Sequence, residues 1–499
     1  MNLEESIKIY NEKKTILKAV NYVYYLNSWD IQTEAPQDSI EEKNKVMDFF
    51  SELEYKAMTS KDYVEAVNYM YDNREKLDKV LSHEITKIKE ENDKIKKIPQ
   101  KEFTQYLSTL NSAYNKFVEA KKIGNYDLVK DDLAKIITYK KNYIKWQGAK
   151  NYNILLDEYE KNSSMEMYDK FFDLIKQKIV PLIKQINEKK LIYNRKIFEQ
   201  DFDIEKQKQF SLILRDILGL NPKRYTIKES EHPFTTNFTN RDVRTTNHYY
   251  KSLLKSAIFS DIHEMGHALY ELNVSDEFND TMSGGGTSMA MHESQSRFME
   301  NLIGRNYNFW LSNFNKLKEL FLKELENCTL SDFYNYINEV GCDFIRTEAD
   351  ELTYPIHVCI RYEIEKGIFE NKYTVDELPK VWNKFYKDYL GIEVKNDTEG
   401  ILQDMHWYGG DFGYFPTYAL GTAYACQIYN AMNKDFSIDD ALKDNKINKI
   451  TEWLKNHIHI YGSSKDSDEI LYLATGEKFN PNYYIDYLLS KYKKLYDID

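Results

Sequence analysis

Apolar residues recur three or four positions apart along most of the chain, with polar and charged residues between them. This spacing is typical of amphipathic helices that bury one face. Short breaks separate the runs, for example at Pro99 and at residues 219–222. The pattern predicts helices throughout the chain, and the clearest lie at residues 63–70, 77–98, 167–192, 309–325 and 485–496.

Composition agrees with a mainly α-helical fold and shows no domain boundary. Only 18 glycines and 9 prolines occur in 499 residues, too few for long linkers or many tight hairpins. Length alone would suggest about three domains, yet no repeat, low-complexity tract or shift in composition marks a junction. We therefore expect a single catalytic unit over residues 1–499, although the sequence also allows two domains that meet near Gln200.

The candidate chemistry begins in residues 260–270, a helical run that contains His263, Glu264 and His267. Histidines four positions apart lie on one face of a helix, so both imidazoles can bind one metal ion. The intervening glutamate can then take a proton from a water that the metal has acidified. A pattern this short also arises by chance, with both histidines solvated on a surface helix. An apolar face favours the metal site, and its residues are Ile262, Met265 and Leu269, with Ala257 and Ile258 one turn earlier.

A catalytic zinc ion normally has three protein ligands and one open position. A second helical run, residues 288–300, follows the glycine-rich turn at 283–287 and can fold back antiparallel on the first. It carries Glu293 and Glu300, which are seven positions apart and close to one face. Spacing leaves both as candidates for the third ligand, and an exposed acid is the alternative for either.

The sequence around these residues resembles the Taq-type thermostable carboxypeptidase family of metallopeptidases. The run His292-Glu293-Ser294-Gln295, after the His-Glu-x-x-His helix, is similar to a motif of that family. Four further motifs occur in the family's order: HPF at residues 232–234, DxRxT at 242–246, IRxxAD at 345–350 and GxxQDxHW at 400–407. The resemblance extends from about residue 20 to the C-terminus, and it implies that Glu293 is the third metal ligand.

The resemblance also has implications for architecture and assembly. It implies a large, mainly α-helical metallopeptidase fold with a deep substrate groove and a small antiparallel β element beside the zinc helix. The alternating residues around Val243 and Thr245 fit a short hairpin there. An N-terminal helical half, roughly residues 1–200, would roof a catalytic half at 201–499. The family further implies a homodimer.

An enzyme that acts at a peptide C-terminus must bind the free carboxylate, and the planar guanidinium of arginine can do so through two parallel hydrogen bonds. Arg346, in the IRxxAD motif, is our first candidate, and Arg361 is the second. Arg244 is a third, which would instead limit how far the substrate extends. The alternative for each arginine is an ordinary ion pair with one of the many acidic side chains.

The oxyanion that forms during peptide hydrolysis needs a hydrogen-bond donor besides the metal. Glycines after His406 allow sharp turns that could bring Tyr414 or Tyr418 beside it. Related helical zinc peptidases pair a histidine with a later tyrosine, so the resemblance favours His406 and Tyr418 as catalytic residues and leaves Tyr414 as a substrate contact. Asp350 is a candidate to accept the outer N–H of a zinc-bound histidine.

Charge and targeting signals favour a cytoplasmic enzyme. With 68 basic and 80 acidic residues, the net charge of −12 argues against a nucleic-acid-binding surface. The acidic N-terminus has no apolar core like that of a signal peptide, and no apolar stretch approaches the length of a membrane span. The four cysteines lack Cys-x-x-Cys spacing, so we expect reduced thiols and neither a disulfide framework nor a second metal site.

The sequence thus predicts a zinc-dependent metallocarboxypeptidase that releases single amino acids from peptides with a free C-terminus. Cobalt or manganese could occupy the same ligands. The closest alternative is a helical zinc oligopeptidase, which cuts internal bonds and needs no arginine at the end of the groove. A metal-binding scaffold without turnover is disfavoured, because it would have no need of a base at Glu264.

Overall fold

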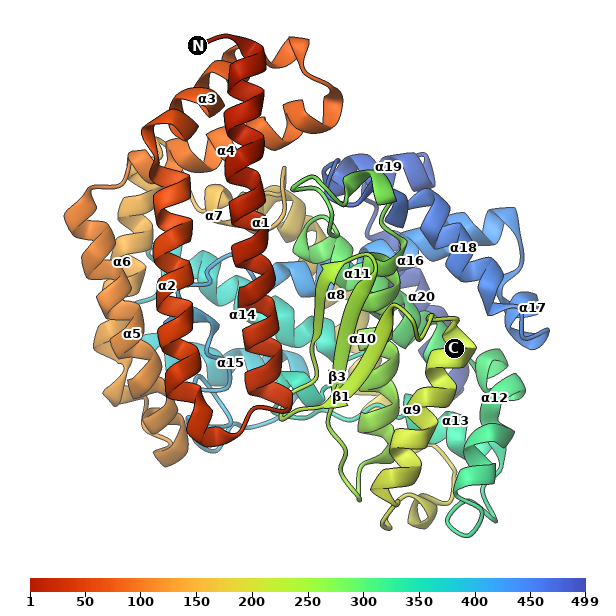
Figure 1. Ribbon diagram of the computed structural model, residues 1–499. Helices are drawn as coiled ribbons and strands as arrows, with labels where there is room; N and C mark the ends of the chain where they lie inside the picture. Colours follow the sequence, from red (N-terminus) through yellow and green to blue (C-terminus); the bar gives the residue numbers. More distant parts are fainter.

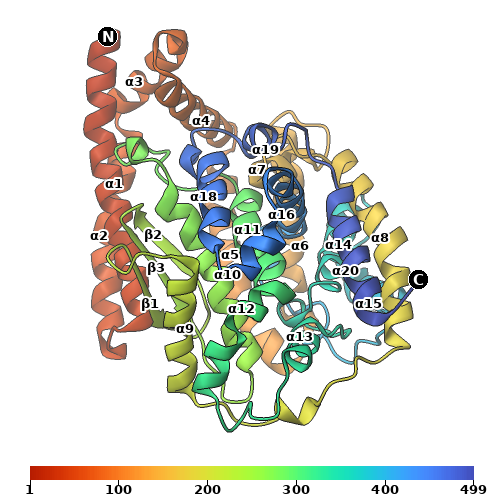
Figure 2. The ribbon, with the colours of Figure 1, turned by 90° about the vertical axis from the view of Figure 1, so that its right-hand side faces the viewer.

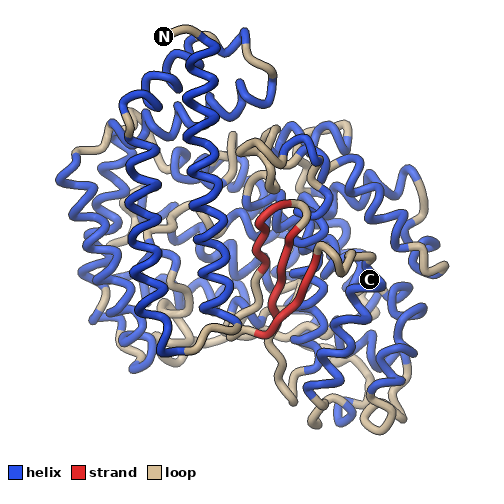
Figure 3. Tube along the Cα trace, in the orientation of Figure 1, coloured by secondary structure: helices blue, strands red, loops and turns tan.

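The computed structural model describes all residues from 1 to 499, and nearly all of its regular structure is helical (Figure 3). The helices before the sheet are α1 (Leu3–Thr33), α2 (Ile40–Thr59), α3 (Lys61–Asp72), α4 (Lys79–Lys96), α5 (Gln100–Ile123), α6 (Lys130–Trp146), α7 (Asn153–Tyr159), α8 (Met165–Asn187) and α9 (Ile204–Leu218). The strands are β1 (Tyr225–Glu229), β2 (Thr235–Thr239) and β3 (Asp242–Asn247). The helices after the sheet are α10 (Leu254–Asn273), α11 (Met289–Arg297), α12 (Tyr307–Leu320), α13 (Leu330–Asn338), α14 (Tyr354–Phe369), α15 (Leu378–Leu390), α16 (Pro416–Asp435), α17 (Ile438–Lys443), α18 (Ile447–His457), α19 (Ser467–Thr475) and α20 (Asn482–Tyr496).

Each predicted helical run lies mainly within one of these helices, and local signals explain several of their ends. The side chain of Asp203 accepts a hydrogen bond from the backbone N–H of Lys206 at the start of α9. Gly219 adopts the left-handed conformation at the end of that helix, where a residue with a Cβ would be strained. Thr329 and Asp332 form a reciprocal capping box at the start of α13.

The N-terminal helices form a layer with a small core of its own. α1 and α2 make a long hairpin, and α3 and α4 pack near the free end of α1 (Figure 1). Seen from the side, this hairpin lies next to the strands (Figure 2). A much larger core of 100 buried residues draws on the chain from Ala113 to Tyr496 and so includes residues on both sides of position 200. The seven residues of the small core are Tyr10, Leu17, Ala57, Tyr63, Val67, Met70 and Ile85.

The sheet has three strands in the order β1-β3-β2, and it is mixed. β2 and β3 form the predicted antiparallel hairpin, with Thr235 opposite Thr245. The third strand, β1, was not predicted, and it pairs with β3 in parallel, with Tyr225 opposite Val243. Only Tyr225 is buried among the residues of β1, so this strand lacks the alternation that reveals a half-buried strand in a sequence.

Helix α11 packs closely against both α10 and α16, and two glycines make this possible. A Cβ atom at Gly266 of α10 would lie 2.7 Å from the backbone oxygen of Gln295. A Cβ atom at Gly421 of α16 would lie 2.8 Å from the Cβ of Glu293. Any side chain at either position would therefore push the helices apart, and Glu293 is held against two neighbouring helices. None of the helices has the length and apolar character that crossing a membrane requires.

Candidate metal centre and active site

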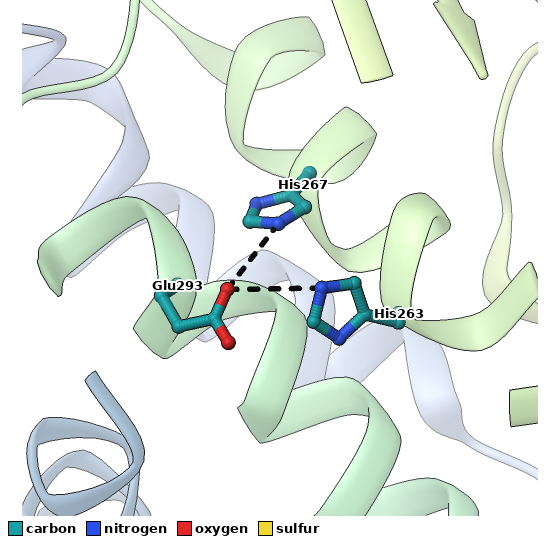
Figure 4. Close-up of side chains that lie close together, drawn as sticks. All are labelled: His263, His267 and Glu293. Carbon is teal, nitrogen blue, oxygen red and sulfur yellow. Dashed lines mark ion pairs between the residues drawn. The ribbon is translucent and has the colours of Figure 1, made fainter. Parts of the chain in front are cut away.

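Two histidines of α10 and one glutamate of α11 point toward a common space (Figure 4). The Nε2 atoms of His263 and His267 lie 3.7 Å and 3.6 Å from the Oε2 atom of Glu293. All three candidate ligand atoms lie within 4.8 Å of one another. Two imidazoles and a carboxylate are a donor set that suits a catalytic zinc ion, so these residues fit the predicted metal.

Glu264 lies between these histidines in the sequence and is almost fully buried, with 8% of its surface exposed. Thr235 of β2 donates a hydrogen bond from Oγ1 to Oε2 of Glu264, at 2.5 Å. Burial raises the pKa of Glu264, although the nearby His263 opposes this shift. A buried carboxylate with a raised pKa is a stronger base than an exposed one, as a residue that accepts a proton from water requires. Sequence reasoning did not identify Thr235, because its contact depends on how β2 packs against α10.

The outer nitrogen of His263 faces a carboxylate from the far end of the same helical run as Glu293. Its Nδ1 atom lies 2.9 Å from Oε2 of Glu300. Glu300 belongs to a π-helical segment, Phe298–Gly304, that directly continues α11. It also accepts hydrogen bonds from Arg297 and Arg305. Burial opposes ionisation of Glu300, but these arginines and His263 hold its pKa well below the usual range.

The structure therefore assigns different places to three acids that the sequence brought into consideration. Glu293 lies among the candidate metal ligands, and Glu300 lies against the outer side of His263. The prediction for Asp350 was wrong, because its carboxylate accepts the backbone N–H groups of Leu352 and Thr353 and caps the turn before α14. Spacing alone does not separate Glu293 from Glu300, because their roles depend on how α11 and the segment after it pack against α10.

Arg346 and Arg361 share one acidic partner. Arg346 donates from Nη2 to Oδ1 of Asp404, at 2.9 Å, and Arg361 donates from Nε to Oδ2 of the same carboxylate, at 2.6 Å. Arg361 is completely buried, and its remaining nitrogens face Gln403, Tyr386 and the backbone oxygen of His357. Burial opposes ionisation of Asp404, yet the two guanidinium groups hold its pKa below the usual range.

Arg346 also contacts Tyr418 and Tyr354, which connect it to the other candidate residues. Its guanidinium is stacked over the ring of Tyr418, 4.9 Å from the centroid, and donates from Nη1 to the hydroxyl of Tyr354, at 3.2 Å. The ring of Tyr354 in turn lies under Arg297, which donates to Glu293. A continuous set of contacts thus joins the Arg346–Asp404 pair to the candidate metal ligands.

His406 and Tyr418 lie beside each other, as the pairing of a histidine with a later tyrosine predicted. The Nε2 atom of His406 is 3.5 Å from the hydroxyl oxygen of Tyr418, and the ring of Tyr414 packs against both residues. Burial lowers the pKa of His406 to about 4, so its imidazole is neutral at neutral pH. Glu365 of α14 fixes the segment that follows, because it accepts hydrogen bonds from Trp407 Nε1 at 2.6 Å and Gly413 N at 2.7 Å.

Arg244 lies apart from the other two arginines, on strand β3. It donates from Nε to Oδ1 and from Nη2 to Oδ2 of Asp242, at 2.8 Å and 2.7 Å. Its guanidinium is stacked on Phe238 of the same hairpin and faces the ring of Trp29 from α1, at 4.5 Å and 5.7 Å from the centroids. Arg244 therefore lies where the N-terminal hairpin meets the sheet.

A sequence model of the Carboxypeptidase Taq (M32) metallopeptidase family matches residues 9–492. The chain belongs to this family. Among curated relatives, Carboxypeptidase 1 of Bacillus subtilis (strain 168) is 39% identical over 474 residues, which cover 94% of this chain and 95% of that protein. Thermostable carboxypeptidase 1 of Pyrococcus furiosus is 32% identical over 496 residues, with 98% of each chain covered.

Solved structures of M32 carboxypeptidases have the same fold. The carboxypeptidase of Pyrococcus furiosus matches with a TM-score of 0.93 at 31% identity, over 99% of each chain. The M32 carboxypeptidase of Deinococcus radiodurans R1 matches with a TM-score of 0.94 at 26% identity, over 99% of this chain and 100% of that one. These matches confirm the predicted helical metallopeptidase fold and the predicted class of enzyme, a metallocarboxypeptidase.

Proposed function

We propose that this M32 enzyme is a zinc-dependent carboxypeptidase that releases one amino acid at a time from peptides with a free C-terminus. The observation that carries the proposal is the convergence of His263, His267 and Glu293 beside the buried carboxylate of Glu264. Cobalt or manganese could take the same ligands, but two imidazoles and one carboxylate favour zinc. When bound, the metal ion would acidify a water and polarise the scissile carbonyl group.

In the proposed mechanism, Glu264 takes the proton of the attacking water and later delivers it to the departing amine. Its buried position supports this role, because a desolvated carboxylate binds a proton more readily than an exposed one. The Thr235 hydroxyl occupies one oxygen of Glu264 and so fixes the carboxylate in one orientation. The other oxygen is then free to face the water.

We assign the developing oxyanion to His406 and Tyr418. A neutral imidazole and a phenol both donate hydrogen bonds without bringing a charge into the site, and both side chains belong to one packed cluster. Burial raises the pKa of Tyr418, so the phenol keeps its proton. Tyr414, which packs against both residues, would contact the substrate.

We assign the substrate carboxylate to Arg346. Both arginines donate to internal partners, but the side chain of Arg346 is 7% exposed, whereas that of Arg361 is completely buried. Arg361 would act through Asp404, by occupying one carboxylate oxygen and thereby orienting the other toward Arg346. Arg244 would limit the length of the bound peptide from beneath α1, where it contacts Trp29.

The test uses one peptide with either a free or an amidated C-terminus, incubated with the purified enzyme with and without a chelator. We expect mass spectrometry to show loss of one residue at a time from the free acid only, and no cleavage after chelation. Internal cuts in both peptides would instead establish the alternative, a zinc oligopeptidase. No cleavage after zinc or cobalt is restored would refute both.

The setting and assembly are further proposals. We infer that the enzyme works in the cytoplasm, which its four free cysteines support, since disulfides are rare there. We also infer a homodimer, for which α2 offers apolar side chains at Val46 and Phe49, exposed at 50% and 63%.

We further infer that residues 1–200 roof the catalytic half as part of one unit over residues 1–499. The contact of the Trp29 ring with the Phe234 ring supports this arrangement.

A further inference from the structure

The two candidate histidine ligands have different partners on their outer sides. His263 faces the carboxylate of Glu300 directly, whereas His267 faces a third imidazole. The Nδ1 atoms of His267 and His292 are 2.6 Å apart, and the Nε2 atom of His292 is 2.7 Å from Oε1 of Glu271. We propose that Glu271 and His292 form a positioning relay that orients His267 and thereby sets the metal affinity of the site. This inference rests on the proposed metal site.

Hydrogen-bond chemistry determines the direction of this relay. An ionised carboxylate only accepts, so the hydrogen of His292 lies on Nε2, toward Glu271. A neutral imidazole then carries a lone pair on Nδ1, which accepts the N–H of His267 Nδ1. The remaining nitrogen of His267, Nε2, consequently has a free lone pair on the side that faces Glu293. The relay thus selects the one tautomer of His267 that can bind a metal ion there.

Two further segments donate hydrogen bonds to Glu271 and fix its carboxylate, from which the relay begins. It is 4% exposed, and its Oε1 atom accepts the backbone N–H of Gly286 at 3.0 Å. Its Oε2 atom accepts a hydrogen bond from the side chain of Asn237 on β2, at 2.6 Å. The position of His267 therefore depends on the hairpin and on the glycine-rich loop before α11, and not on α10 alone.

The glycine-rich loop touches the relay directly. A Cβ atom at Gly286 would lie 2.8 Å from Cδ2 of His292 and 2.8 Å from Cε1 of Tyr270, so any side chain there would press on both rings and disturb the packing of the imidazole. A Cβ atom at Gly285 would meet only ordinary contacts, at 3.4 Å from Asn237 and 3.5 Å from Glu271. Neither glycine has a left-handed backbone. The two positions therefore form a matched pair, of which only one perturbs His292.

The experiment measures the Kd of Zn²⁺ for the full-length protein by competition with a chelator, together with thermal unfolding of the metal-free protein. We expect His292→Ala to weaken zinc binding by roughly 10- to 100-fold, as for other partners of metal ligands. His292→Asn should retain more affinity, because its Oδ1 atom can accept the N–H of His267. Gly286→Ala should weaken binding in the same direction, and Gly285→Ala should bind zinc as the unaltered protein does.

If His292 had only a structural role, His292→Ala would lower the unfolding temperature of the metal-free protein and leave the Kd of Zn²⁺ unchanged. That result would overturn the relay. Equal losses of affinity in Gly285→Ala and Gly286→Ala would overturn it too, because they would reflect a general disturbance of the loop. His267→Ala separates this failure from that of the metal site. If His267→Ala abolishes zinc binding while His292→Ala has no effect, only the relay is wrong. If His267→Ala itself binds zinc normally, the proposed metal site is wrong as well.

Discussion

Gly421 of α16 gives the most direct test of how closely the candidate ligand Glu293 is held. A Cβ atom at this position would lie 2.8 Å from Cβ and 2.9 Å from Cγ of Glu293, and 2.9 Å from the backbone oxygen of Ala290. Carbon atoms in ordinary contact are about 3.5–4.0 Å apart, so Gly421→Ala requires a displacement of roughly 0.7 Å or more. Either the ligand or one of the two helices must move.

The effects on stability and on metal binding should differ. Overpacking a buried contact costs about 1–3 kcal/mol, whereas replacing glycine by alanine within a helix returns about 1 kcal/mol. The net loss of unfolding free energy is therefore about 0–2 kcal/mol, and the metal-free protein should fold. A site of this kind tolerates displacements of only about 0.5 Å, so moving Glu293 should weaken zinc binding by at least about tenfold.

The assay is chelator competition for Zn²⁺, combined with urea unfolding of the metal-free protein. Gly341→Ala is the control, because its backbone is not left-handed and a Cβ atom there meets nothing within 4 Å. This control should bind zinc normally. The reasoning would be refuted if Gly421→Ala lost stability as expected but bound zinc as tightly as the unaltered protein, since α16 would then have absorbed the whole displacement.

Three further predictions concern the proposed catalytic residues and one buried acid. Glu264→Gln should retain zinc but lose turnover by roughly 10²- to 10⁴-fold, as expected for a general base, and loss of the metal would contradict this role. Arg346→Ala should weaken the binding of a free-acid peptide, measured as a competitive inhibitor, by about 2–4 kcal/mol and leave the binding of its amide unchanged. Equal losses for both peptides would instead assign the substrate carboxylate to Arg361 or Arg244. Burial raises the pKa of Glu365 to about 7 from its ordinary value of 4.5. Between these two pH values the folded state keeps a proton that the unfolded state releases, so the free energy of unfolding should fall as pH rises from 4.5 to about 7. The free energy of unfolding in urea should differ between pH 5 and pH 8 by on the order of 2 kcal/mol because of this group, and Glu365→Gln should remove that difference. If the variant kept the same difference, Glu365 would be ionised at both pH values.

Much of the fold and part of the site follow from local sequence signals. Spacing between residues close together in the chain was enough to predict the long helices, the hairpin of β2 and β3, and the shared face of His263 and His267. The relation between Arg346, Arg361 and Asp404 could not be predicted in this way, because it depends on how two loops pack against α14. Thr235 was missed because its contact with Glu264 depends on how β2 packs against α10. β1 was missed because only one of its residues is buried, which leaves no recognisable alternation.

The choice between Glu293 and Glu300 shows most clearly where reasoning from sequence ended. Spacing placed both acids near one face of a helix, and only one of them was expected to matter. The structure places both against His263, with Oε2 of Glu293 3.7 Å from Nε2 and Oε2 of Glu300 2.9 Å from Nδ1. Seven residues of regular α-helix rise by about 10.5 Å, and π-helical turns are wider and tend to occur at functional sites. The π-helix that begins at Phe298 therefore offers a physical reason why one helical run can bring a carboxylate to each nitrogen of a single imidazole.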